Sequence, residues 1–135
     1  SLTVLKEQVW PRIDLFTGPI FEEVCQQFFW QTGLSGGLSF IPANIGGWWK
    51  ANEEIDLIVM GEKEAILVAC KWSAQPAGMD ILAQLERKAQ MVKQDLGDRA
   101  IRFGLCSRSG FTPQLTADGK RRQDVTFFDL PEIVG

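Results

Sequence analysis

Two neighbouring apolar segments in the middle of the chain have the pattern of paired β-strands. Glu54–Met60 and Ala65–Trp72 are rich in β-branched and aliphatic residues, and Gly61–Glu64 between them supplies one glycine and three charged side chains. A short polar segment between two such runs is typical of a hairpin turn. The sequence therefore predicts that these two segments form adjacent antiparallel strands.

The register of this hairpin follows from the pattern of apolar positions. An even loop of two or four residues sets apolar side chains opposite one another on one face, as a buried face requires. The same register places Asp56 opposite Ala69 and Glu54 opposite Lys71. Two carboxylates and one lysine then gather on the other face, at one end of the hairpin. A three-residue loop would instead set Asp56 against Val68, so we expect the even loop.

The rest of the pattern predicts helices and strands that surround this hairpin. Apolar residues at helical spacing predict helices over Ile20–Gln31 and Ile81–Leu96. Residues 107–115 are expected to form a loop with a short helix, and residues 116–123 a polar connection. Further strands are expected at Leu38–Ile41, Ile101–Cys106 and Val125–Leu130. A strand, a helix and a strand in succession favour a crossover to a parallel neighbour, so the predicted fold class is α/β, with a central mixed sheet flanked by helices.

Composition narrows the class of protein. The 135 residues are 45% hydrophobic and 23% charged, which is ordinary for one globular domain, and no apolar run approaches the ~20 residues of a membrane span. Because the chain has no histidine, Ser–His and Cys–His nucleophilic catalysis are excluded. Cys25, Cys70 and Cys106 lie far apart without a CxxC spacing, so we expect reduced, packed thiols in a cytoplasmic protein.

Basic side chains are concentrated in one part of an otherwise acidic chain. The formal net charge is −3, yet residues 84–122 carry nine basic and four acidic side chains. Such a segment can bind a phosphate backbone even though the net charge of the chain is negative. The candidate DNA-binding residues are Lys88, Lys120, Arg121 and Arg122. The alternative is a solvated helix followed by a charged loop, and composition does not separate the two.

The carboxylate and lysine at the end of the hairpin have two interpretations. One is a surface ion pair, worth under about 1 kcal/mol. The other is a phosphodiesterase site, in which carboxylate oxygens hold Mg²⁺ and a lysine offsets phosphate charge and positions water. Spacing alone favours the ion pair, because aspartate and lysine are common on strand surfaces.

Longer motifs around the hairpin resemble a known family. They are IGGWWK, EEIDLIVM, AILVACKWS, LAQLERKAQ and FGLCSRSGFTPQL, with FEEVCQQFF nearer the start. Together they resemble a domain of uncharacterised function that lies C-terminal to P-loop ATPases of archaea and bacteria. That family is similar to the PD-(D/E)xK nuclease superfamily, whose restriction-endonuclease-like core runs αβββαβ. The resemblance implies a nuclease-like domain over residues 18–135, and an N-terminal extension or linker over residues 1–17.

The resemblance assigns roles to particular residues. Asp56 matches the metal-binding aspartate, Lys71 the catalytic lysine, and Glu22 a carboxylate often found on the first helix. The pattern has a carboxylate two residues before the lysine, where this chain has Ala69, which cannot coordinate a metal. The main-chain carbonyl of Cys70 is implied as a further ligand. The expected Mg²⁺ site is therefore weakened, since Mg²⁺ is usually held by one or two carboxylates plus waters.

Other polar residues near the hairpin have secondary roles. Glu54 is a substitute for the missing carboxylate, although it could instead pair with Lys71, and Glu86 is a weaker candidate. Gln84 and Lys88, one turn apart on the second helix, are expected to face the site, as polar residues of this helix do in related nucleases.

Two functions follow from the resemblance. The first is a Mg²⁺-dependent DNA endonuclease. The second is a catalytically inactive nuclease-fold module that binds DNA or a protein and regulates an attached or partner P-loop ATPase.

The apolar residues within 1–17 either cover an edge of the fold or form a dimer contact, so a homo-oligomer is one of the two alternatives. That segment lacks the pattern of a signal peptide, and we expect no membrane association.

Adjacent tryptophans, Trp48 and Trp49, cannot share one face of a strand. We expect one in the core and the other at a cleft or interface.

Overall fold

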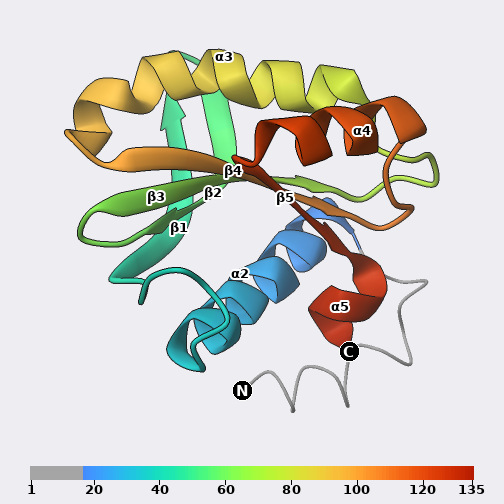
Figure 1. Cartoon of the computed structure of the whole chain (residues 1–135), viewed down its shortest axis with the longest axis horizontal. Helices are drawn as coiled ribbons and strands as arrows, with labels where there is room; N and C mark the ends of the chain where they lie inside the picture. The colour runs from blue at the N-terminus through green and yellow to red at the C-terminus, as the bar shows by residue number, and fades with distance from the viewer. Residues whose placement is uncertain (1–16) are drawn as a thin grey trace.

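The computed structural model describes residues 17–135 and forms a five-stranded mixed sheet between two layers of helices (Figure 1). The strands lie in the sheet in their order along the chain. The expected extension or linker over residues 1–17 lies, apart from its last residue, outside the described residues. The elements are α2 (Gly18–Leu34), β1 (Asn44–Lys50), β2 (Glu53–Met60), β3 (Glu64–Lys71), α3 (Met79–Leu96), β4 (Ala100–Ser107), α4 (Pro113–Arg122), β5 (Val125–Asp129) and α5 (Leu130–Val134).

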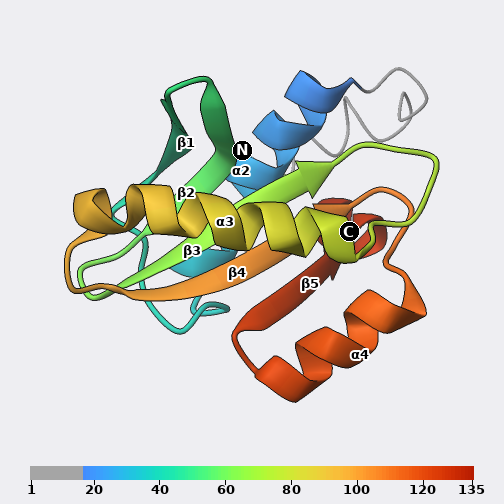
Figure 2. The same ribbon diagram turned by 90° about the horizontal axis from the view of Figure 1, so that it is seen from above.

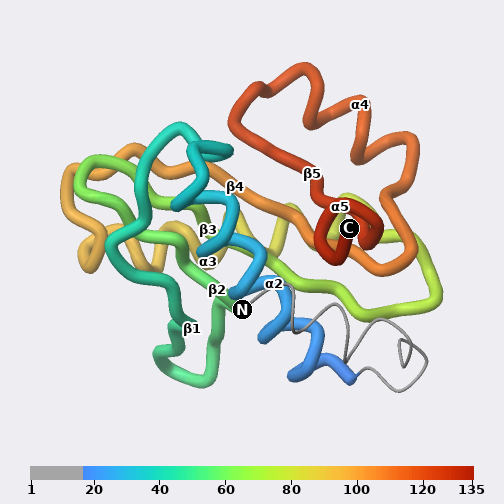
Figure 3. Tube along the Cα trace, turned by 90° about the horizontal axis from the view of Figure 1, so that it is seen from below, coloured from blue at the N-terminus to red at the C-terminus, as the bar shows by residue number. Residues whose placement is uncertain are grey.

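The sheet separates two apolar cores. Helices α3 and α4 cover one face, and α2 and α5 cover the other, as Figure 3 shows from the side of α2. Alternate residues of β3 face each layer, so Leu67 packs in the core under α3 and Val68 in the core under α2. In the core under α2, the ring centroids of Phe28 and Phe29 lie 5.4 and 5.1 Å from that of Phe128. These edge-to-face contacts pack α2 directly against β5.

The β2–β3 hairpin has the predicted even loop. Met60 pairs with Ala65 across a four-residue turn, and the Gly61 N–H donates to the Glu64 carbonyl at 2.8 Å. The ladder also contains the predicted apolar pairs, Leu57 with Val68 and Val59 with Ile66. The register inferred from the apolar pattern is thus confirmed for this part of the hairpin.

The first strand was predicted in the wrong place. Residues 38–41 form an irregular segment, and the strand that pairs with β2 is β1, which contains both tryptophans. Phe40 packs its ring on Gly61, where an added Cβ would lie 2.4 Å from a ring carbon. The apolar residues of this segment therefore cover the edge of the core without forming a ladder. Glycines in β1 had weakened its strand signal, since glycine is depleted in strands.

The β1–β2 turn uses two residues with positive φ, Ala51 at 53° and Asn52 at 67°. Two successive residues of this kind are typical of a type I′ hairpin turn, which usually contains glycine. Because neither residue is glycine, the amino-acid pattern does not clearly indicate this hairpin.

The C-terminal half contains the predicted parallel strands. β4 runs parallel to both β3 and β5, and α3 and α4 make the two connections. The short helix expected to end at Leu115 continues to Arg122, so the polar connection expected over residues 116–123 is wrong for all but its last residue. Thr112 caps the helix by accepting a hydrogen bond from the Leu115 N–H at 3.3 Å, and Pro113 begins its first turn. β5 ends one residue before the predicted strand end, because Pro131 lies in the first turn of α5. Among the described residues, none of the helices has both the length and the apolar character that crossing a bilayer requires.

Candidate functional site

Strands β2 and β3 diverge at one end of the sheet and leave a gap between them (Figure 2). Their pairing ends at Leu57 and Val68. Beyond that pair, β2 continues along β1, and β3 continues along β4. The predicted pairs further along the hairpin, Asp56 with Ala69 and Glu54 with Lys71, are consequently absent from the ladder.

A β-bulge in β2 lies at the start of this gap. Gly46 pairs with Ile58 but Trp48 pairs with Ile55, so β2 has one more residue than β1 between the two pairs. Asp56 is one of the two β2 residues in this interval. Bulges of this kind redirect side chains and are frequent beside functional sites.

The bulge changes which side chains face each helix layer. Ile55 packs under α3 and Leu57 under α2, although residues two apart on an unbroken strand share one face. Glu54, the neighbour of Ile55, pairs with Trp49, and both line a cavity beside α2. The bulge thus places Glu54 within reach of α2. It also explains why the alternative ion pair between Glu54 and Lys71 does not form among the described residues.

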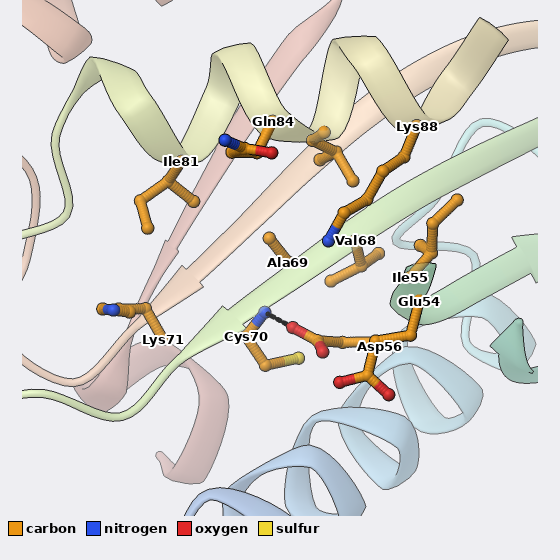
Figure 4. A pocket seen from close by; sticks show the side chains of 11 residues that line it. Glu54, Ile55, Asp56, Val68, Ala69, Cys70, Lys71, Ile81, Gln84 and Lys88 are labelled. Carbon is orange, nitrogen blue, oxygen red and sulfur yellow. Dashed lines mark hydrogen bonds between the residues drawn. The ribbon is translucent and has the colours of Figure 1, made fainter. Parts of the chain in front are cut away.

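The Asp56 carboxylate occupies the gap between the strands. Its Oδ2 accepts a hydrogen bond from the Cys70 backbone N–H at 2.7 Å, in place of the missing ladder bond (Figure 4). The N–H and C=O of one strand residue point to the same side when it exchanges bonds with an antiparallel partner. We infer that the Cys70 carbonyl also points into the gap, beside Asp56. This is the direction that its expected role as a metal ligand requires.

Two cavities meet at Asp56, and their charges differ. The cavity beside α3, of about 280 Å³, has two lysines and two carboxylates in its lining. The cavity beside α2, also about 280 Å³, has four carboxylates and no lysine or arginine among the described residues of its lining. Glu54 and Asp56 line both. The further charged residues are Lys71 and Lys88 on the α3 side, and Glu22 and Glu23 on the α2 side.

Burial and mutual repulsion act on the carboxylates of this site. Burial raises the pKa of Asp56, the Cys70 N–H opposes the increase, and the charge of Glu54 adds to it. Burial also raises the pKa of Glu22, and the charges of Asp56 and Glu54 raise it further. Within residues 17–135 none of these three carboxylates takes part in an ion pair. A bound cation would relieve the repulsion among them.

Two amines approach the α3-side cavity from different directions. In Figure 4 the Lys88 side chain extends from α3 toward β3, whereas Lys71 lies at the opposite end of the cavity. Both charges lower the pKa of Asp56, and Lys88 has the larger effect of the two. Gln84 lines the same cavity, as expected, and so does Ala69, where the superfamily pattern has a carboxylate. Asp56 and Lys71 thus line one cavity together with a second amine, Lys88, while their shared role in a site stays a prediction.

The basic residues at the end of α4 are largely engaged in ion pairs. Arg122 contacts Glu86 at 2.7 Å and Asp124 at 3.0 Å, and Arg121 forms an ion pair within its own helix. Lys120 is exposed. Glu86 is therefore a partner of Arg122 and does not line either cavity, which argues against it as a substitute ligand. The proposed DNA contact by these three basic residues stays a prediction.

The two tryptophans point in opposite directions, as predicted. Trp48 packs against the core under α3, and its indole N–H donates to Asp95 at 3.1 Å. Trp49 is 75% exposed and lines the α2-side cavity. An ion pair of 2.9 Å between Glu53 and Arg87 holds the same hairpin against α3. These contacts fix the β1–β2 hairpin beside the gap.

The fold and the site define an α/β domain with a carboxylate-lined gap in its sheet. Residues 2–92 match DUF234, a family described as archaea bacterial proteins of unknown function, and the chain belongs to this family. The match extends from before α2 into α3, and so includes the residues that line the gap. It ends before β4, and so excludes the basic end of α4.

A curated relative is an uncharacterized protein of Methanocaldococcus jannaschii, MJECL04. The identity is 31% over 93 residues, which is 66% of this chain and 21% of the relative. The chain thus spans about a fifth of the length of the protein it matches. No solved structure matches the chain significantly.

Proposed function

We propose that this chain is a nuclease-like domain that acts on or binds DNA through a Mg²⁺ site in the gap between β2 and β3. The proposal includes a restriction-endonuclease-like core, αβββαβ. The order α2, β1, β2, β3, α3, β4 supports this assignment. So does the position of the bulge, which brings an aspartate to the point where two strands separate.

The observation that carries the proposal is the convergence of Glu22, Glu54 and Asp56 at one gap, where none of them forms an ion pair with another described residue. Carboxylate and carbonyl oxygens are the hard ligands that Mg²⁺ prefers. Glu22 and Asp56 would hold the ion, with the Cys70 carbonyl beside them. Glu54 would replace the carboxylate that Ala69 lacks. The donor set therefore fits Mg²⁺, although the substitute comes from a different strand position.

The amines have a separate role in this proposal. A bound Mg²⁺ would polarise the phosphoryl group and lower the pKa of a coordinated water. Lys71 and Lys88 would bind the phosphate oxygens and offset their charge from the α3 side. Trp49, exposed beside the acidic cavity, would contact the sugar or base next to the reacting phosphate.

The match also suggests the setting of the domain. Because the chain covers 21% of its relative, most of that protein lies outside the aligned part. We propose that the domain is the C-terminal part of a longer protein with a P-loop ATPase domain. A catalytically inactive module that binds DNA or a partner and regulates that ATPase is the second candidate, and Ala69 is the observation that favours it.

A plasmid-nicking assay tests the proposal. Supercoiled DNA is incubated with the chain in Mg²⁺, Mn²⁺ or EDTA, and nicked product is quantified on gels. The active enzyme predicts metal-dependent nicking that Asp56→Asn reduces by at least about 100-fold. Glu62→Gln, in the exposed β2–β3 turn, is the matched control and should leave the rate unchanged.

The variant Ala69→Glu distinguishes the two candidates. Nicking by this variant alone, with DNA binding by the parent chain, would identify the inactive module. Nicking by both would support the enzyme. If neither cleaves and neither binds DNA at low salt, where phosphate contacts are strongest, the nucleic-acid proposal is wrong.

A further inference from the structure

Three cysteines from distant parts of the sequence meet at the core under α2. Cys25 lies in α2, Cys70 in β3 and Cys106 in β4, and their Sγ atoms all lie within 4.8 Å of one another. Cys70 and Cys106 are directly opposite each other on parallel strands. All three are free thiols, and they are the only cysteines of the chain. The fold thus gathers every thiol of the protein at one point.

The thiols lie in a largely buried site. Cys25 and Cys106 are 0% and 1% exposed and belong to the core under α2. Cys70 is partly exposed, and it packs against the same core. Of the three residues, Cys70 is therefore the one that an ion from solvent can approach. The shell of apolar side chains excludes water from the other two sulfurs.

We propose that Cys25, Cys70 and Cys106 form a site for one soft d¹⁰ metal ion, Cu(I), held by three sulfurs. Thiolate ligands select soft ions, whereas Mg²⁺ requires oxygen. Zn²⁺ takes four ligands in structural sites, and the group found among the described residues supplies only three. Cu(I) can be coordinated by three sulfur ligands alone. The three S–H protons leave for solvent as three Cu–S bonds form, and no oxidation state changes.

Cys70 would connect this site to the proposed Mg²⁺ site without sharing a ligand atom. Its sulfur lies within 4.8 Å of the other two sulfurs, while its backbone N–H donates to Asp56. Occupation of the three-sulfur site would therefore fix β3 where it borders the gap. The Cu(I) proposal does not depend on nuclease activity, because the sulfurs and the carboxylates bind ions of different chemistry.

An anaerobic titration of the reduced, purified chain tests the proposal. Cu(I) is added in competition with a chromophoric Cu(I) chelator, with Zn²⁺ and Mg²⁺ as parallel arms. We expect one equivalent of Cu(I) per chain, tighter than Zn²⁺, with no binding of Mg²⁺ by sulfur. Cu(I) should also raise the thermal midpoint and prevent a thiol reagent from labelling the three cysteines under mild denaturation.

Substitutions locate the ion. Cys25→Ser and Cys106→Ala should each weaken Cu(I) binding at least about 10-fold, whereas Glu62→Gln in the exposed β2–β3 turn should not change it. If a cysteine variant does not fold, the labelling of the parent chain decides the result, since an ion bound elsewhere leaves all three thiols reactive. Binding of less than half an equivalent, Zn²⁺ binding as tight as Cu(I), or Cu(I) binding without thiol protection would each overturn the assignment.

Discussion

Replacing Asp56 with asparagine should stabilise the metal-free protein at neutral pH. The Asp56 carboxylate is partly buried, and burial together with the charge of Glu54 raises its pKa. An asparagine has nearly the same shape and keeps an oxygen that can accept the 2.7 Å hydrogen bond from the Cys70 N–H. The substitution therefore removes the unfavourable charge while it retains the contact that closes the gap.

We expect the free energy of unfolding to rise by about 1 kcal/mol, which is within the usual range for a single stabilising substitution. The gain must depend on pH. The native pKa of Asp56 is raised, so the folded state holds this proton more tightly than the unfolded state does. Wild-type stability from this group is consequently present below the unfolded pKa, about 3.9, and is lost as pH rises through the native pKa. The advantage of Asp56→Asn should be full at pH 7 and should shrink as pH falls toward about 4.

Urea unfolding in EDTA at several pH values measures this difference, and Glu62→Gln in the exposed turn is the control. Repeating the measurement in Mg²⁺ adds a second comparison. If Asp56 holds the ion, Mg²⁺ should stabilise the wild type and not the variant, because a ligand that binds only the folded state raises its stability. A variant that is less stable in EDTA at pH 7, or whose advantage grows at low pH, would refute the reasoning about burial and repulsion.

Two further predictions concern α4 and its basic end. Gly119→Ala should lower the free energy of unfolding by about 1–3 kcal/mol in urea, because its Cβ would lie 2.3 Å from the Phe127 ring, whereas Gly18→Ala meets nothing within 4 Å and should be nearly neutral. Arg122→Ala should reduce stability by about 1 kcal/mol through its lost ion pairs, and should change DNA affinity less than Lys120→Ala does in an anisotropy titration at low salt. A larger loss of DNA affinity for Arg122→Ala would show that its carboxylate partners release it on binding.

The sequence was most informative where a periodic pattern was long. The β2–β3 hairpin, α2 and α3 have clear apolar periodicity, and the structure contains all three close to their expected bounds. β1 was missed because it contains two glycines and ends in a turn without one. Only the start of α4 was predicted, as a short helix through Leu115, because its ten residues include Gly119 and only one buried aliphatic side chain, Leu115. In both cases tertiary packing supplies stability that local preference does not indicate.

The candidate site likewise has features that local sequence predicts and features that depend on tertiary packing. Register alone predicted that Asp56 and Lys71 would border one site, and helix phase predicted that Glu22 would approach it. The side on which Glu54 lies could not be predicted, because it depends on a bulge that exists only in the pairing of β2 with β1. A one-residue irregularity reverses the facing of every residue beyond it. Local sequence cannot specify such a feature when the partner strand is itself misplaced.

The unequal charges of the two cavities favour a cation in one cavity and a phosphate in the other. Within residues 17–135, the α2 side of the gap has four carboxylates and no basic residue in its lining, whereas the α3 side has both lysines. A divalent cation is therefore favoured on the α2 side, near Glu22, and a phosphate on the α3 side, near Lys88. Ala69 faces the second cavity, where a carboxylate would repel that phosphate unless a metal neutralised it. Its absence thus weakens metal binding and strengthens anion binding at the same time. A domain with this arrangement can retain affinity for a phosphate backbone even where its capacity for hydrolysis is reduced, which makes DNA binding the more robust half of the proposed function.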